Sequence, residues 1–400
     1  MEPKLRLKGY RGDWMSSKIG QIATFSKGSG YSKSDLCKNG NPIVLYGRMY
    51  TRYQSIIDDV DTFVVPKQNS VYSHGGEVII PGSGESPEDI SLAATIKNSG
   101  VILGGDLNVL KFDENINDPS LMAMAITYSP TRAQLSNYAQ GKTVVHLRNS
   151  EIAKGTICYP SVDEQKAIVE YVSSIDGLIT ASSSHLESLR KMKAASLQVM
   201  FPQEGKTIPR VRFKGFEGDW KKVKADSIFK TFNEKNRPDL PVLSATQDRG
   251  MVTRESIGYN IFHDKSNETT YKHILPGQFV IHLRSFQGGF AHSEIEGIAS
   301  PAYTIMDFKD KDLYYDYFWR YVFMSKEFIK RLELITYGIR DGRSISFDEF
   351  KEMIFIVPCK EEQVKIASYL RNIDKQITLQ SQHLEKLKQI KASCLEKMFV

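Results

Sequence analysis

The sequence has few cysteines and no long apolar run. The four cysteines stand at positions 37, 158, 359 and 394 of 400 residues. They form no C-x-x-C pair and have no histidine at zinc-ligand spacing, which argues against a disulfide framework and a structural metal site. No apolar run approaches the roughly 20 residues that cross a bilayer, and the charged N-terminal residues lack an apolar signal region. We therefore expect a cytoplasmic protein with no membrane partner.

The sequence also lacks several motifs that are typical of catalytic sites. We find no Gly-rich cofactor loop after a strand, no Asn-Pro-Pro-Tyr-like motif and no G-x-x-x-x-G-K-[ST] loop. The one nuclease-like fragment, Glu164-Gln-Lys166, returns as Glu362-Gln-Val364 and so loses its lysine. A lysine lost from an otherwise kept motif favours a structural role at a helix start. We predict a non-catalytic chain without a cofactor.

The composition is that of a globular protein with a slight excess of positive charge. Hydrophobic residues make up 41% of the chain and charged residues 25%, as in ordinary globular proteins. A chain of 400 residues is too long for one ordinary core and suits two domains. The net charge of +6 permits a polyanionic partner without requiring one.

The chain contains a duplication, visible first in a short motif. Residues 6–14, RLKGYRGDW, recur at residues 212–220 as RFKGFEGDW, with six identities in nine positions. Both copies keep a tryptophan beside an identical Gly-Asp turn. We expect Trp14 and Trp220 to anchor each domain to a helix in the core rather than to lie on a ligand-binding surface.

A longer match covers residues 160–201 and 358–399, which align without a gap at an offset of 198 residues. Apolar residues recur there at helical spacing close to a heptad, including Ile168, Tyr171, Val172, Leu178 and Met192 in the first copy. Each copy therefore predicts a helix of about forty residues, the first opened by a capping box at Ser161–Glu164. A long helix with one apolar seam needs a partner, and the other copy is the obvious one.

The two blocks between the repeats share little sequence but the same order of elements. In the first, strands are expected at 41–46, 62–65, 77–80 and 94–96, and a helix at 119–128. In the second, strands are expected at 241–244, 278–283 and 302–306, and one helix at 313–334. We predict an α/β (mixed α+β) fold: two domains separated by two long antiparallel helices that form an intramolecular coiled coil with pseudo-two-fold symmetry.

The tandem Pro-x-x-x-Glu-Gln-x-x-Ile signature, with a downstream Ile-Asp, resembles the specificity subunits of type I restriction-modification enzymes over essentially the whole chain. The resemblance implies target-recognition domains at 1–158 and 221–356, conserved long helices at 159–201 and 357–400, and a linker and junction at 202–220. It implies that each domain reads one half of an asymmetric bipartite DNA site. It also implies that the helices set the spacer and dock two methyltransferase subunits, with restriction/translocase subunits joining through the complex. His185 and His383, at equivalent helix positions, suit packing or docking.

Loops that combine aromatic, basic and amide side chains are the candidates for contact with double-stranded DNA, because they offer stacking, phosphate contacts and hydrogen bonds to base edges. A solvated surface charge or an internal ion pair is the alternative for each of these side chains. The predicted residues are Tyr46, Arg48, Tyr50, Arg52, Tyr53, Ser83 and Lys142 in the first domain, and Gln247, Arg249, Arg254, Arg284, Phe286, Gln287, Arg340 and Arg343 in the second.

Two other functions stay open at this level. A coiled-coil adaptor that presents two protein-binding domains would show the same duplication, but would bind partner proteins rather than DNA through its domains. A self-sufficient nuclease or methyltransferase would act as the purified chain alone, in spite of the missing motifs.

Overall fold

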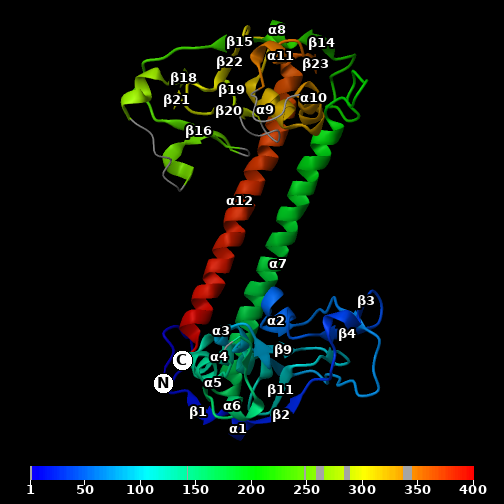
Figure 1. Cartoon of the computed structure of the whole chain (residues 1–400), viewed down its shortest axis with the longest axis vertical. Coiled ribbons are helices and arrows are strands. Elements are labelled where there is room, and N and C mark those ends of the chain that lie inside the picture. Colours follow the sequence, from blue (N-terminus) through cyan, green and yellow to red (C-terminus); the bar gives the residue numbers. More distant parts are fainter. Residues whose placement is uncertain (1, 142, 247–248, 258–264, 283–288, 337–344) are drawn as a thin grey trace. The chain divides into compact units, whose positions relative to one another are not determined.

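The computed structural model describes residues 2–141, 143–246, 249–257, 265–282, 289–336 and 345–400. The chain forms two compact units. The first consists of residues 1–183 and 382–400, and the second of residues 184–381. Each unit therefore combines a globular domain with parts of two long helices, α7 (Val162–Val199) and α12 (Lys360–Met398) (Figure 1).

The globular part of the first unit is a mixed α/β domain. Its helices are α1 (Ile19–Ile22), α2 (Arg48–Thr51), α3 (Pro87–Ile90), α4 (Pro119–Tyr128), α5 (Pro130–Tyr138) and α6 (Asn149–Ile152). Its strands are β1 (Met15–Lys18), β2 (Ala23–Lys27), β3 (Leu36–Cys37), β4 (Asn41–Val44), β5 (Ile56–Ile57), β6 (Phe63–Val64), β7 (Glu77–Pro81), β8 (Ser83–Gly84), β9 (Ala94–Ile96), β10 (Ile102–Leu103), β11 (Leu107–Phe112), β12 (Val145–His146) and β13 (Thr156–Tyr159).

A five-stranded sheet with the order β2-β11-β7-β9-β5 forms the centre of this domain. The helix α4 packs against β7 and β9, and every residue of α4 from Leu121 to Thr127 is buried. Asp118 caps this helix by accepting hydrogen bonds from the backbone amides of Ser120 and Leu121 at 2.8 and 3.2 Å. The predicted helix at 119–128 is confirmed.

The second unit contains a related domain with a more aromatic core. Its helices are α8 (Ala225–Ile228), α9 (Asp316–Met324), α10 (Lys326–Thr336) and α11 (Phe347–Phe350). Its strands are β14 (Lys221–Lys224), β15 (Phe229–Phe232), β16 (Leu243–Thr246), β17 (Gly250–Thr253), β18 (Lys272–Ile274), β19 (Phe279–Ile281), β20 (Phe290–His292), β21 (Gly297–Ala299), β22 (Thr304–Phe308) and β23 (Ile354–Val357). The central sheet has the order β15-β22-β19-β20.

The prediction of one helix at 313–334 was wrong, because two helices, α9 and α10, occupy this stretch. The break falls at Ser325, whose backbone is extended. Its hydroxyl accepts a hydrogen bond from the amide of Phe328 at 3.2 Å, which satisfies one of the free donors at the start of α10. A serine inside an apolar periodic stretch is a weak helix-stop signal, and the pattern alone did not reveal it.

The long helices run antiparallel to each other within each unit. In the first unit, Lys391 of α12 donates to Asp176 of α7 at 2.5 Å. In the second, Lys193 of α7 forms an ion pair with Asp374 of α12 at 2.6 Å. These are the same two repeat positions with the helices exchanged, which explains why both copies keep an Ile-Asp and a Lys-Ala pair.

The predicted apolar seam is only partly correct. Ile168 and Val172 are buried in the core of the first unit, beside Leu395 and Met398 of α12. Leu178 and Met192, assigned to the seam from their spacing, are 55% and 41% exposed. Tyr171 is 38% exposed, but its hydroxyl lies 3.8 Å from the sulfur of Cys394 on α12. The apolar stripe on the helix is thus wider than the contact between the helices, and part of it faces solvent.

Candidate nucleic-acid interface

The motif that opens each repeat is bound to the first turn of a long helix. The Nε and Nη2 atoms of Arg6 donate to the two carboxylate oxygens of Glu164, both at 2.8 Å. Arg212 binds Glu362 in the same way at 2.7 and 2.8 Å, and both carboxylates are buried. Hydrogen bonding to these carboxylates raises the pKa of each arginine. Since its carboxylate is bound to Arg6, Glu164 acts as a clamp and not as the expected half of a capping box.

The neighbouring glutamine joins the helix to the globular domain. The side-chain oxygen of Gln165 accepts from the amide of Asp118 at 2.7 Å, and its nitrogen donates to the carbonyls of Ile116 and Pro160 at 3.0 and 2.9 Å. Gln363 makes the equivalent contacts in the second unit with Tyr315, Leu313 and Pro358 at 3.0, 3.1 and 3.0 Å. The Glu-Gln pair is therefore a structural joint, as predicted for a motif that loses its lysine.

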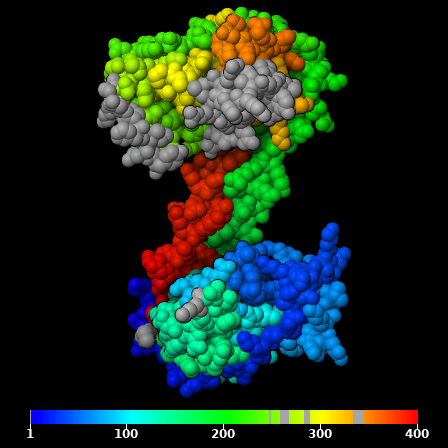
Figure 2. Space-filling model, viewed as in Figure 1, coloured from blue at the N-terminus to red at the C-terminus, as the bar shows by residue number. Residues whose placement is uncertain are grey.

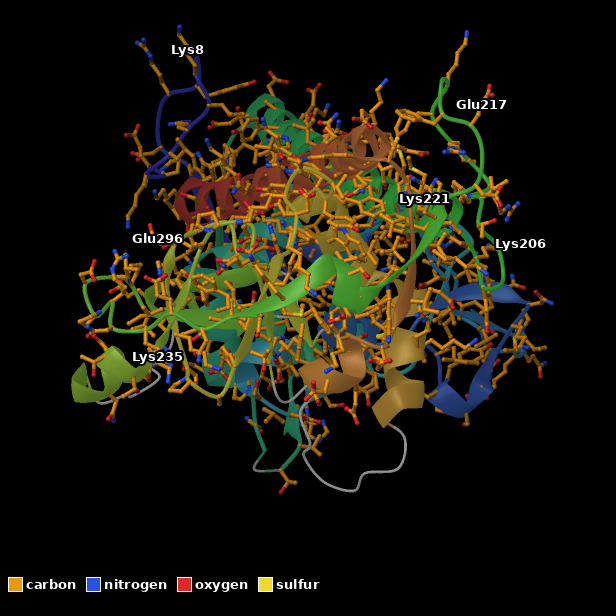
Figure 3. All side chains as sticks on the ribbon, turned by 90° about the horizontal axis from the view of Figure 1, so that it is seen from above. Lys8, Lys206, Glu217, Lys221, Lys235 and Glu296 are labelled. Atoms are coloured by element: carbon orange, nitrogen blue, oxygen red, sulfur yellow. The ribbon has the colours of Figure 1, made fainter. Side chains whose placement is uncertain are left out.

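The tryptophans of the repeated motif lie in the cores, as expected. Trp14 packs edge to face on Phe399 with ring centroids 6.3 Å apart, and Trp220 packs on Phe201 at the same distance. The outer parts of these segments face solvent, and Lys8 and Glu217 extend away from the ribbon in Figure 3. The repeated residues thus build the scaffold, and a surface that differs between the copies has to lie on the globular domains.

Two of the predicted arginines in the first domain share one carboxylate. The guanidinium of Arg48 donates to Asp61 at 2.6 Å, to Gln54 at 2.9 Å and to the carbonyl of Asp59 at 2.8 Å. Arg52 pairs with the other oxygen of Asp61 and its side chain is 51% exposed. Hydrogen bonding to Arg48 lowers the pKa of Asp61. Arg48 is therefore held inside the domain, whereas Arg52 remains accessible to a ligand.

Tyr50 and Ser83 are brought together although 33 residues separate them. The Tyr50 hydroxyl donates to the Ser83 carbonyl at 2.6 Å, and burial raises the pKa of this tyrosine. Tyr46 packs edge to face on Tyr50 at 6.1 Å and is 40% exposed. Ser83 itself lies in β8, which pairs with β12 through His146. The short helix α2 and the β8–β12 pair therefore form one local surface, with Tyr46 as its exposed aromatic side chain.

Tyr53 points into the domain instead. Its hydroxyl donates to the carbonyl of Ala93 at 3.0 Å and also lies 3.3 Å from the hydroxyl oxygen of Thr127. Desolvation raises the pKa of this hydroxyl. Tyr53 thus packs within the domain and is only partly exposed, and its contact with DNA stays a prediction.

In the second domain, Arg249 and Arg254 differ in the same way. Arg249 is exposed beside the strand β17. Arg254 donates from Nε to the hydroxyl of Ser244 at 3.3 Å, and its guanidinium lies 5.9 Å from the ring centroid of Tyr271. Arg254 therefore braces the domain, and Arg249 is the accessible cation. The remaining predicted residues, Lys142, Gln247, Arg284, Phe286, Gln287, Arg340 and Arg343, lie outside the described residues.

A cavity of about 590 Å³ in the first domain was not predicted. It is lined by residues from four separate stretches of the chain, among them Lys27, Gly82, Asp106 and Arg148. Lys27 and Arg148 are 121 residues apart, and no local pattern links them. Only the fold, which brings β2 beside the turn before α6, places them around one cavity.

The described residues contain no cluster of three or more His, Cys, Asp or Glu side chains that could hold a metal ion. Among the helices of the described part of the chain, none is both long enough and apolar enough to cross a membrane.

Comparison with known proteins places the chain in a family. The model of the type I restriction modification DNA specificity domain matches residues 11–190 and again 217–389. The S subunit of a type I restriction-modification system from M. genitalium has a similar fold, with a TM-score of 0.61 and 15% identity over 100% of this chain and 99% of that one. A chain from a structure of type I R-M complex assembly and conformational transition gives a TM-score of 0.51 at 15% identity, over 97% and 98%.

A search of curated protein sequences finds no match. The family model covers most of the chain in two copies, and these copies contain both Glu-Gln pairs and nearly all residues of the two predicted recognition domains. The chain belongs to the type I restriction-modification DNA specificity family.

Proposed function

We propose that the chain reads a two-part double-stranded DNA target, with residues 1–158 reading one half and residues 221–356 the other. As a member of its family, the chain is the DNA-recognition subunit of a type I restriction-modification complex and is not itself the catalytic subunit. Residues 159–201 and 357–400 serve as the conserved helices, with a junction at 202–220. In this proposal the helices set the spacer between the two half-sites.

This proposal rests on one observation: the contacts that join helix and domain are the same in both units, whereas the globular domains differ. The Arg-Glu, Gln-backbone, Trp-Phe and Lys-Asp contacts recur in both units with nearly equal distances. The domains between these contacts differ in sequence and in sheet order. The distance along the chain between the repeats that flank each domain also differs, by eight residues. A common scaffold with two unlike surfaces suits the recognition of two unlike half-sites.

Within each domain, the accessible cations and aromatics are the residues we assign to DNA. In the first domain these are Tyr46 and Arg52, with Arg48 and Tyr50 holding the local surface from behind. In the second domain Arg249 is the accessible residue among those described. The charge of the exposed arginines suits phosphate and base contacts, and the exposed Tyr46 ring suits stacking.

We assign the helices to two methyltransferase subunits because an exposed apolar site recurs on them. In the second unit, Met192 is 41% exposed on α7, seven residues after the exposed His185. In the first unit, Ile390 is 40% exposed on α12, seven residues after the exposed His383. Residues seven apart lie on the same helix face. Part of the surface of both helices is open in the space-filling view (Figure 2). Two equivalent sites fit two copies of one partner, and the restriction/translocase subunits join through that complex.

Placing a charge on either site should remove one partner. A Met192→Glu variant and an Ile390→Glu variant should each bind one methyltransferase subunit instead of two, because a carboxylate is costly to bury in an apolar contact. The double variant should bind none. Native mass spectrometry of the co-purified complex measures the ratio. The matched controls are Ser184→Glu and Gln382→Glu, which are exposed at equivalent repeat positions about 80° around the helix from Met192 and Ile390. Two bound subunits in both single variants would contradict the assignment.

The methylated motif itself tests the recognition function. The complex should methylate one bipartite sequence, and exchanging residues 15–158 for the recognition domain of another family member should change one half of it. Sequencing of methylated positions in DNA from cells that carry each chain measures this. Methylation without a shared bipartite motif, or a change in both halves, would refute the proposal. If the domains bound partner proteins and no DNA, the alternative of a coiled-coil adaptor with two protein-binding domains would be favoured.

A further inference from the structure

We propose that the cavity between β2 and α6 in the first domain is a binding site for one phosphodiester group of the DNA. This inference rests on the proposed function and adds to it a backbone contact, made by Lys27 and Arg148, that sequence patterns do not reveal. The site requires only the first unit.

The cavity is shaped by a position that has no side chain. A Cβ atom on Gly82 would overlap the Oδ1 atom of Asp106 and lie 3.2 Å from the Nζ atom of Lys27. The backbone around it is fixed, since the Gly82 amide donates to the Asp106 carbonyl at 2.6 Å and the Gly82 carbonyl accepts from the amide of Leu147 at 3.0 Å. Glycine therefore keeps the space in front of the lysine open.

The cations at this cavity are not used by the fold. Within the described residues, neither Lys27 nor Arg148 has an ion pair or a side-chain hydrogen bond, and both side chains are exposed. Asp106 is the one carboxylate in the lining, so two cations stand against one anion. Arg48 and Arg6, in contrast, have their carboxylates in direct contact. A concave site with unpaired cations suits an anionic ligand.

The second domain has other residues at the two cation positions. By the offsets of the flanking repeats, Lys27 corresponds to Asn233 and Arg148 to Ser346. Ser346 caps α11 by accepting from the amide of Asp348 at 3.1 Å, which is a structural role. Residues that build the scaffold are kept in both copies, as Arg6 and Arg212 are. The two cations differ between the copies, and so belong with the surface that differs rather than with the joint.

The cavity is linked to the surface already assigned to DNA through the β8–β12 pair. His146, in its lining, pairs in β12 with Ser83 of β8, whose carbonyl accepts from Tyr50. A DNA strand on the exposed Tyr46 and Arg52 would thus have its backbone near the cavity. Phosphate contacts from lysine and arginine position a protein on DNA without reading sequence. We therefore assign Lys27 and Arg148 to affinity and not to the choice of bases.

The test uses the complex with its methyltransferase subunits and a duplex that carries the motif this complex methylates. A Lys27→Gln, Arg148→Gln variant should bind it about five- to tenfold more weakly at 0.1 M salt, with a salt slope reduced by about 0.9 for one lost phosphate contact. The methylated motif should stay the same. Ethylation of single phosphates should weaken wild-type binding at a position in the first half-site, and the variant should be insensitive there. Lys27→Arg with Arg148→Lys should keep the slope, as should the control Lys111→Gln, an exposed lysine outside the cavity.

An unchanged salt slope and an unchanged ethylation pattern would overturn the phosphate site, and a changed methylated motif would overturn the assignment to affinity alone. Failure of the wild-type complex to bind its duplex specifically would refute the proposed function instead. Because both side chains are exposed, the glutamine variants should fold. The ethylation pattern of the wild-type complex gives a second measurement, since the absence of any sensitive phosphate in the first half-site would also overturn the site.

Discussion

An Arg212→Met variant should lose about 3 to 5 kcal/mol of stability in the second unit, because it leaves the carboxylate of Glu362 buried without a partner. Glu362 has 0% exposure, and Arg212 provides both hydrogen bonds to its oxygens. Hydrogen exchange measured separately in residues 184–381 and in the rest of the chain reports the loss. A two-unit chain need not unfold in one step, so a single melting temperature is a poor substitute.

A double variant separates the ion pair from simple packing. Arg212→Met combined with Glu362→Met should recover most of the lost stability, because apolar side chains of similar volume often replace a buried pair at little cost. Arg6→Met is the matched change in the first unit and should lower protection there while the second unit stays unaffected. A loss below about 1 kcal/mol in Arg212→Met would mean that water reaches Glu362 and that the clamp is not needed for the joint.

A Phe229→Ala variant should also cost about 3 to 5 kcal/mol, by opening a cavity in the core of the second domain. Phe229 is fully buried and lies with its ring centroid 5.0 Å from that of Trp319 and 5.1 Å from that of Phe308. Further aromatic rings, Phe279, Phe323 and Phe350, surround it. Their shapes leave little scope for collapse into the vacated space. Hydrogen exchange in β15 and β22 is the direct readout.

The first domain contains a natural comparison for this change. By the repeat offset, Phe229 corresponds to Ala23, which lies at the start of β2 in the first domain. The position therefore tolerates alanine where the surrounding core is aliphatic. Phe229→Leu should lose clearly less stability than Phe229→Ala, because it leaves a smaller cavity. Equal losses in the two variants would show that ring geometry, and not volume, sets the cost at this site.

The duplication and the long helices were predictable because the pattern that indicates each of them lies within one continuous stretch of sequence. Forty residues of helical spacing kept at a fixed offset predict a helix pair, and the structure has α7 and α12 within three residues of the expected bounds. The width of the apolar stripe was misleading. Spacing alone cannot separate Val172, which packs on the partner helix, from Met192, which faces solvent.

The DNA interface was harder to predict, because arginine and tyrosine side chains suit both an exposed binding surface and contacts inside a domain. In the stretch from Tyr46 to Tyr53, Arg52 and Tyr46 are accessible, while Arg48 and Tyr53 have internal partners. Those partners, Asp61 and Ala93, follow in loops and strands whose positions depend on the tertiary fold. Lys27 and Arg148 gave no signal for the same reason, because contacts between distant stretches leave no periodicity in one chain. The contact of the predicted residues with DNA remains a prediction.

The joint at the start of each domain also sets an order of events in folding. The amide of Val211 donates to the carbonyl of Val199 at 2.9 Å, a contact between near neighbours in sequence. Its counterpart joins Leu5 to Lys397 at the same distance, across almost the whole chain. The first unit buries Leu395, Met398 and Phe399 in its core, whereas the second is one continuous segment. During synthesis the second unit can close as soon as residue 381 has emerged, because it needs nothing that follows. The first domain is translated first and completes its core last, so until then it exposes the apolar surface that these C-terminal residues cover.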